Sequence, residues 1–247
     1  MKQISSIHNP LVKEWSLLHD GKERKEKRLF LIEGYHLVEE AHKAGCLREV
    51  LITKVSDEVA GVDNILVTPE IIGKLVKTKT PQGIIGICSM NEALSLSKNR
   101  YLVLDGVQDP GNVGTLLRSA LGFGIQGVIL SPTCADVYHD KVIRSTQGAL
   151  FHLDLYMGEL TPYIAALKER NIPILGTDVS KGTLVTELKP TSSFALILGS
   201  EAQGMSPVVS AQVDELIHIK TSSQLESLNV AIAGSIILHH LMVIGGY

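Results

Sequence analysis

The 247-residue sequence contains little cysteine, and its three cysteines, Cys46, Cys88 and Cys134, lie far apart. No two of them have the spacing of a zinc-ligand pair, and none of the nine histidines belongs to an HExxH motif. A zinc enzyme is therefore not expected, and no metal site is predicted. Because an odd number of dispersed cysteines is typical of a reducing compartment, we expect a cytoplasmic protein.

Long apolar runs are missing as well. No run reaches the roughly 18 residues that a membrane-spanning helix needs. The segment 230–244 comes closest, but His239 and His240 interrupt it, so we interpret it as a buried helix. The first fifteen residues, MKQISSIHNPLVKEW, contain no apolar core of the kind found in signal peptides. We therefore expect no membrane partner.

The usual nucleotide-binding motifs are also absent. The apolar segment YLVLDGV leads into QDPGNVGTLLRSALGFG, which has the pattern of a strand, a glycine-containing loop and a helix. The glycines do not form GxGxxG, and no GK[ST] follows them. No acidic residue sits suitably downstream to bind a ribose, so a Rossmann NAD(P) protein is disfavoured.

Charge is distributed unevenly along the chain. The net charge is −3, but residues 1–100 carry +2 and residues 101–247 carry −5. The basic side chains of the first part concentrate in GKERKEKRLF, residues 21–30. Such a run either contacts nucleic-acid phosphates or forms a solvated helix face with mixed charges. The candidate nucleic-acid-binding residues are Lys22, Arg24, Lys25, Lys27 and Arg28.

Helix and strand patterns alternate in two parts of the chain. Residues 1–90 predict a smaller α/β domain, and the polar stretch 91–100 is interpreted as a linker. Residues 101–247 contain five apolar strand candidates, YLVLDGV, GVILSP, IPILGTD, FALILGS and ELIHIK. Helical segments lie between most of them, including HDKVIRSTQGALFHL, and a long helical pattern runs from Ser227 to about Met242. Near-continuous apolar strands between helices are typical of a parallel sheet covered on both faces.

Three segments that follow strands mix small residues with a few polar ones. They are GVQDPGNVGTLLR, GSEAQGMS and TSSQLESLNVAIAG. Ligands of parallel α/β sheets bind at the carboxyl ends of the strands, and small residues let a ligand approach the backbone closely. Each segment alone is a weak signal, because glycine-containing turns after strands are often purely structural.

Together, these segments resemble the three motifs of the SpoU (TrmH-like) RNA ribose 2′-O-methyltransferases of the SPOUT superfamily. Asn112 and Arg118 match the first motif, Gly199, Glu201 and Gly204 the second, and SLN at 227–229 the third. The first part of the chain, with SSIHNPLVKEW and RLFLIEGYHLVEEA, looks like the L30e/L7Ae-like substrate-binding domain of this family. One departure is Lys220, which stands where many relatives have proline.

The resemblance implies S-adenosylmethionine as cofactor and transfer of its methyl group to a ribose 2′-hydroxyl of RNA. It implies catalytic roles for Arg118, Asn112, Glu201, Ser227 and Asn229. It implies cofactor binding by Thr177, Gly199, Glu201, Gly204, Ile219 and Leu228. Without it, Arg118 reads as a surface arginine paired with an acidic neighbour, and Ser227 and Asn229 read as helix caps.

The resemblance also implies a C-terminal trefoil knot in the catalytic domain and a homodimer. Ribosomal RNA, most simply 23S rRNA, is the favoured substrate, because the first domain is more similar to that of rRNA-directed members. Two alternatives stay open at this point. One is a tRNA ribose 2′-O-methyltransferase, and the other is a non-catalytic RNA-binding or ribosome-assembly protein of the same fold.

Overall fold

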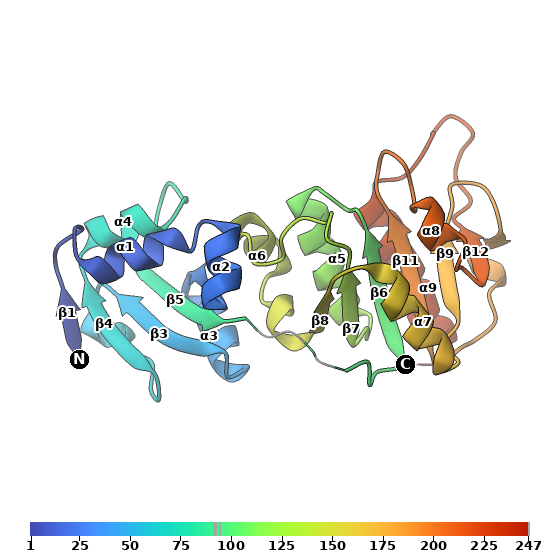
Figure 1. Cartoon of the computed structure of the whole chain (residues 1–247). Helices are drawn as coiled ribbons and strands as arrows, with labels where there is room; N and C mark the ends of the chain where they lie inside the picture. The colour runs from blue at the N-terminus through green and yellow to red at the C-terminus, as the bar shows by residue number, and fades with distance from the viewer. Residues whose placement is uncertain (91–92, 94, 247) are drawn as a thin grey trace. The chain divides into compact units, whose positions relative to one another are not determined.

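A computed structural model describes residues 1–90, 93 and 95–246 of the chain. The chain divides into two compact units (Figure 1). Unit 1 comprises Met1–Asn91 and Tyr138–His152, and unit 2 comprises Glu92–Val137 and Leu153–Tyr247. The predicted linker, 91–100, lies partly outside the described residues.

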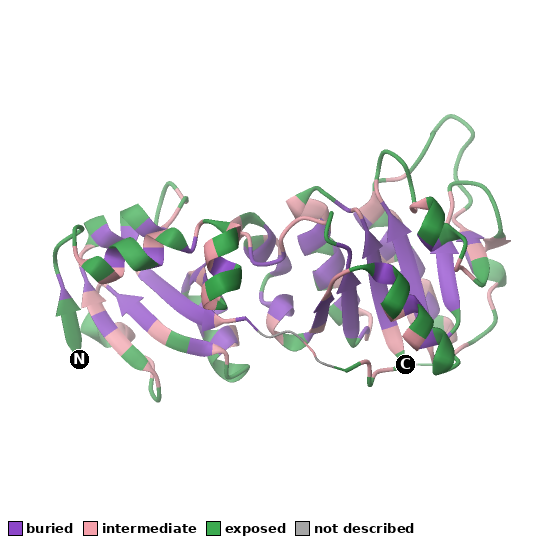
Figure 2. Cartoon of the chain, viewed as in Figure 1, coloured by how far each residue is buried: buried purple, intermediate pink, exposed green. Residues whose placement is uncertain are grey.

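Unit 1 is built on a mixed five-stranded sheet in the order β1-β4-β3-β5-β2. The strands are β1 (Lys2–Ile4), β2 (Leu29–Glu33), β3 (Leu47–Ile52), β4 (Asp63–Val67) and β5 (Ile84–Ser89). β4 runs parallel to β1 and β3, whereas β5 runs antiparallel to β3 and β2. The central strands β3 and β5 are largely buried (Figure 2).

Local signals fix the ends of several helices in unit 1. The helices here are α1 (Pro10–Leu17), α2 (Gly21–Lys27), α3 (Tyr35–Lys43) and α4 (Pro69–Leu75), with a 3₁₀ turn, η1, at Val55–Asp57. Asn9 and Asp20 cap α1 and α2 by accepting hydrogen bonds from backbone N–H groups two residues on. α1 and α4 bury apolar side chains, including Trp15 and Ile71, in the core of this unit.

Unit 1 also contains α6 (Asp140–Thr146) and the 3₁₀ helix η2 (Ala149–His152). The sequence pattern predicts one helix over 139–153, within the second part of the chain. Instead, Gln147 and Gly148 adopt positive φ angles of 50° and 90° and end α6. The segment packs against the first sheet, where the ring of Tyr138 lies 4.7 Å from that of Phe30.

Unit 2 is built on a seven-stranded, entirely parallel sheet in the order β10-β12-β9-β11-β6-β7-β8. The strands are β6 (Arg100–Asp105), β7 (Gly127–Leu130), β8 (Asp154–Met157), β9 (Ile174–Thr177), β10 (Thr183–Leu184), β11 (Phe194–Gly199) and β12 (Glu215–His218). This confirms the predicted parallel α/β sheet and all five predicted strands. β8 and β10 are short strands at the two edges of the sheet, and the sequence pattern predicts neither of them.

Helices α5 (Pro110–Gly122), α7 (Leu160–Glu169), α8 (Pro207–Ser210) and α9 (Val230–Ile244) belong to unit 2, with a 3₁₀ turn, η3, at Val185–Glu187. α9 begins three residues after the predicted start, because Asn229 caps it. Gly234 lets α9 approach β11 and α5 closely, since a Cβ there would lie 2.5 Å from a Leu198 methyl carbon. The trefoil knot stays a prediction. Among the described residues, no helix is long and apolar enough to cross a membrane.

Candidate functional site

The three sequence motifs follow three strands of the same parallel sheet. β6 and β11 are neighbours, and their last residues, Asp105 and Gly199, are register partners. β12 lies two places further along, beyond β9. Because all of these strands are parallel, the loops that follow them emerge at one edge of the sheet. That edge is the location predicted for the site.

The first motif forms the start of α5. Asp109 caps this helix, and its Oδ1 accepts a hydrogen bond of 2.9 Å from the backbone N–H of Asn112. Pro110 occupies the first turn, where its missing N–H costs no hydrogen bond. These signals set the position of Asn112 one turn into the helix, with Arg118 nearly two turns further on.

The second motif is a tight turn after β11. Ser200 and Gly204 exchange two backbone hydrogen bonds, of 3.0 and 2.9 Å, which close the turn and place Glu201 in it. Gly199 is buried against this turn. A Cβ atom at Gly199 would lie 2.1 Å from the carbonyl carbon of Gly204, so only glycine fits there.

A chain of side-chain hydrogen bonds joins the three motifs. The Nδ2 of Asn112 donates to Oε1 of Glu201 at 2.5 Å. The Nδ2 of Asn229 donates to Oδ1 of Asn112 at 3.0 Å, while Oδ1 of Asn229 accepts from the first backbone N–H groups of α9. Asn229 therefore caps its helix and also contacts the first motif. We name this set of three residues the Asn112–Glu201–Asn229 network.

Two predicted catalytic residues lie outside that network. Arg118 and Ser227 are exposed. Within the described part of the chain, neither side chain forms a hydrogen bond or ion pair. The purely structural interpretation, in which an acidic neighbour pairs with the Arg118 guanidinium, is therefore not supported. Its five N–H donors can be offered to a ligand.

The predicted cofactor residues lie at the ends of β9 and β11 or in the segments that follow β11 and β12. Thr177 is the last residue of β9. Its hydroxyl donates a hydrogen bond of 3.0 Å to the carbonyl of Ile197 in β11, which links the two strands. Ile219 and Leu228 are half-buried in the segment that follows β12. Gly204 has φ +69°, and no atom lies within 4 Å of the position that its Cβ would occupy.

Asp178 follows β9 directly and is a fixed carboxylate at this edge. Its Oδ1 accepts hydrogen bonds of 2.9 Å from the N–H groups of Ser180 and Lys181. Partial burial alone would raise the pKa of Asp178, but these hydrogen bonds outweigh it and hold the pKa below its usual value. The carboxylate therefore stays charged across the neutral range.

Asp105 is a positioning residue that the sequence analysis missed. It ends β6 and is 8 % exposed. Its Oδ2 accepts a hydrogen bond of 2.7 Å from the backbone N–H of Ser206, at the end of the second motif loop. The sequence does contain a signal for this role, since Asp105 is an acidic residue at the end of an otherwise apolar strand. A carboxylate buried there requires a hydrogen-bond partner.

The basic run predicted to bind RNA lies on α2 in unit 1. Lys22, Lys25 and Arg28 are exposed, and Lys27 pairs with Glu14 at 3.1 Å. Arg24 is buried, and its Nη1 donates to the carbonyls of Leu18 and His19 at 2.8 and 2.9 Å. The predicted RNA contact by Arg24 is therefore corrected, because this side chain holds the turn between α1 and α2.

Both parts of the chain are similar to known protein families. A protein-family model described as the SpoU rRNA Methylase family matches residues 99–239, more than half of the chain. A second, described as the MRM3-like substrate binding domain, matches residues 9–86. A Bacillus subtilis protein named 23S rRNA (guanosine(2553)-2′-O)-methyltransferase RlmP is 38 % identical over 246 residues, covering 98 % of this chain and 99 % of the relative.

Two solved structures are similar over nearly the full length. An rRNA methyltransferase from Sinorhizobium meliloti with bound AdoMet has a TM-score of 0.89 and 26 % identity, covering 97 % of both chains. A structure described as an RNA 2′-O ribose methyltransferase has a TM-score of 0.81 and 27 % identity, covering 98 % of both chains.

Proposed function

The chain belongs to the SpoU rRNA methylase family, and we propose that it methylates a ribose 2′-hydroxyl of 23S rRNA with S-adenosylmethionine as the methyl donor. The observation that carries the proposal is the Asn112–Glu201–Asn229 network, which joins the three family motifs at the carboxyl edge of the parallel sheet. The favoured RNA follows from the B. subtilis relative, which is similar along the whole chain.

The chemical character of the predicted cofactor residues in unit 2 suits S-adenosylmethionine. Adenine and the methionine chain require apolar contact and close approach to the backbone, and the half-buried Ile219 and Leu228 together with the open side of Gly204 offer both. These residues, with Thr177, Gly199 and Glu201, would hold the cofactor. When bound, it supplies the methyl group for the ribose oxygen.

Arg118 is proposed to bind the RNA at the reacting nucleotide. Its exposed guanidinium can bind a phosphate through two parallel N–H donors and thereby fix the adjacent ribose. A guanidinium stays protonated at neutral pH and is a poor base. We therefore assign Arg118 to orientation and to stabilisation of negative charge that develops on the 2′-oxygen.

The network residues position the other groups. Glu201 fixes the amide of Asn112, and Asn229 holds the opposite end of that amide. Asn112 is thus held at the start of α5, close in sequence to Arg118, where it can orient the ribose. Ser227, two residues before Asn229, is proposed to contact the RNA ribose or the loop backbone. The arrangement provides orientation before the reaction begins, which is a large part of catalysis by such sites.

Mapping of 2′-O-methyl positions identifies the substrate directly. We expect one 23S rRNA position to be unmethylated in cells without this protein and to regain its 2′-O-methyl group when the protein is restored. An unmethylated position in a tRNA, with 23S rRNA unchanged, would instead support the tRNA alternative.

We propose that residues 1–90 form the RNA substrate-binding domain and residues 101–247 the methyltransferase domain, with the C-terminal knot, in a cytoplasmic protein. α6 would then be a piece of the second domain that packs on the first sheet. The match of residues 9–86 to a substrate-binding domain supports this division.

A homodimer is proposed through α9 and the end of α5. Ile232, Ile236 and Val243 lie on one face of α9 at helical spacing and are 54, 42 and 57 % exposed. Leu121 of α5 is also exposed, and α5 is joined to α9 by the hydrogen bond between Ser119 and Ser235. A second copy of this chain would cover these apolar side chains.

Ile236→Asp should convert the dimer into monomer, because it places a charge in the centre of the apolar face. Sedimentation velocity measures the change. The control is Val208→Asp on α8, which is 64 % exposed and lies on a different helix. A wild-type monomer, or an Ile236→Asp protein that stays dimeric, would contradict this interface.

Lys25→Glu combined with Arg28→Glu should weaken RNA binding and leave S-adenosylmethionine affinity unchanged. These two exposed side chains of α2 and its C-cap are proposed to bind phosphates, so the slope of log affinity against log salt should fall by about 1 for each phosphate no longer bound. The control is Lys13→Glu with Lys54→Glu, an equal charge change at other positions of unit 1. If both double variants bind RNA alike, the α2 run is only a solvated face.

A further inference from the structure

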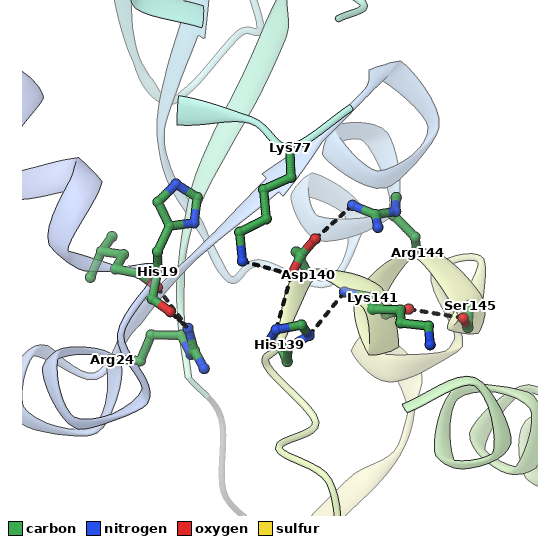
Figure 3. Close-up of polar contacts among 9 residues, drawn as sticks. His19, Arg24, Lys77, His139, Asp140, Lys141, Arg144 and Ser145 are labelled. Carbon is green, nitrogen blue, oxygen red and sulfur yellow. Dashed lines mark hydrogen bonds and ion pairs between the residues drawn. The ribbon is translucent and has the colours of Figure 1, made fainter. Parts of the chain in front are cut away.

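A charged cluster in unit 1 centres on one carboxylate, that of Asp140 in α6 (Figure 3). Arg144 contacts its Oδ2 at 2.8 Å. His139 and Lys77 contact its Oδ1 at 3.3 and 3.6 Å. Lys77 follows α4, so the cluster joins the end of α4 to α6. We name these four residues the Asp140 cluster.

The cluster borders a small cavity of about 40 Å³ in the same unit. Lys77, Asp140 and Arg144 line it, together with His19 and apolar side chains of β2 and α4. Burial, with nearby Lys77 as a further cause, lowers the pKa of His19, so this ring is mostly neutral at neutral pH. The charged side chains of the lining are Lys77, Arg144 and the carboxylate of Asp140 that they share, together with Arg24 and Glu33.

Positive charge exceeds negative charge within the Asp140 cluster. Burial alone would raise the pKa of Asp140, but Arg144, His139 and Lys77 outweigh it and lower the pKa, so the carboxylate is ionised. One negative charge then serves both Lys77 and Arg144. These two side chains remain 51 and 42 % exposed, and the Lys77 contact is long. Both side chains therefore keep exposed surface at which a second anion can bind.

The segment that carries Asp140 and Arg144 is anchored firmly to unit 1. The Nε2 of His36 lies 3.1 Å from the carbonyl oxygen of Gln147, and the Nε2 of His152 lies 2.7 Å from Oε2 of Glu40. Gly148 has φ +90°, and a Cβ there would lie 2.9 Å from Glu40. In sequence, however, the segment lies between β7 and β8 of the methyltransferase sheet.

We propose that Lys77 and Arg144 form a binding site for a backbone phosphate of the RNA substrate, with Asp140 as the counter-ion that holds them when RNA is absent. The inference rests on the proposed function, since it assumes an RNA substrate. It makes the RNA-binding surface of unit 1 a joint product of residues 1–90 and of α6. The guanidinium of Arg144 suits a phosphodiester because it can donate two parallel hydrogen bonds to it.

Three substitutions test the site, because two of them should lower the RNA affinity and the third should raise it. RNA affinity is measured by fluorescence anisotropy on a labelled 23S rRNA fragment over a range of KCl concentrations. Lys77→Gln and Arg144→Gln should each lower the affinity and reduce the slope of log affinity against log salt by up to about 1. Asp140→Asn should do the reverse, because it removes the competing carboxylate while keeping the side-chain shape. Lys74→Gln is the control, since its Nζ donates to the carbonyl of Ile7 and lies outside the cluster.

Thermal unfolding of each variant separates binding from folding. If Arg144→Gln unfolds, Lys77→Gln still decides the question, because Lys77 is the most exposed member of the cluster and has its longest contact. The proposal is overturned if wild-type protein binds RNA and Lys77→Gln binds it with the same affinity and salt slope. It is also overturned if Asp140→Asn lowers RNA affinity at unchanged thermal stability. A wild-type protein that neither binds RNA nor transfers methyl groups would instead remove the proposed function.

Discussion

Arg118→Ala should lower the single-turnover rate of methyl transfer by a factor on the order of 10²–10³, the usual cost of removing one electrostatic donor from a transition state. The affinity for S-adenosylmethionine should change little, because Arg118 is assigned to the RNA. Its guanidinium is exposed, and within the described chain no acidic side chain holds it. The measurement is transfer from saturating labelled cofactor to a substrate RNA.

Two further variants sharpen this test. Arg118→Lys should recover little activity, because an ammonium group cannot reproduce the planar pair of donors. Lys189→Ala removes one positive charge elsewhere in unit 2 and should transfer at the wild-type rate. If Arg118→Ala also transfers at the wild-type rate, the proposed mechanism is wrong even though the family membership stands.

Gly199→Ala should weaken cofactor binding. The added Cβ would lie 2.1 Å from the backbone of Gly204, so the Ser200–Gly204 turn must move. Overpacking of this kind costs about 1–3 kcal/mol. At about 1.4 kcal/mol per tenfold change, the dissociation constant should rise about 5- to 150-fold. Isothermal titration calorimetry with S-adenosylmethionine measures it.

Gly122→Ala is the matched control for that change. Gly122 ends α5 in the same unit, and no atom lies within 4 Å of its Cβ position. This variant should bind the cofactor as the wild type does. Unchanged binding by Gly199→Ala would mean that the turn after β11 does not form the cofactor site.

The sequence predicted which loops share one edge of the sheet better than it predicted side-chain packing. Loop chemistry at the ends of apolar strands is a local signal, and parallel pairing within the sheet that holds β6, β11 and β12 then brings the three motifs to one edge. The exact side-chain partners depend on geometry that sequence spacing does not provide. Glu201 contacts Asn112, and Asn229 is both a helix cap and a contact of Asn112.

Two of the misses, Arg24 and the α6 segment, share a physical cause, which is that tertiary packing leaves no local signal in the sequence. Arg24 lies in a run of charges, and nothing in that run shows which side chain turns toward the end of α1. The α6 segment has an ordinary helical pattern, and only its contacts with Phe30, His36 and Glu40 assign it to unit 1. A knot likewise has no periodic signature, so its prediction depends on the family resemblance alone.

Transfer of labelled methyl groups to 23S rRNA tests the central claim most directly. Purified protein is incubated with labelled S-adenosylmethionine and 23S rRNA that lacks the modification, and the RNA is then digested to nucleosides. We predict that the label appears in a single 2′-O-methylated nucleoside. Label in a methylated base, or no transfer to any RNA by protein that binds the cofactor, would contradict the proposed function.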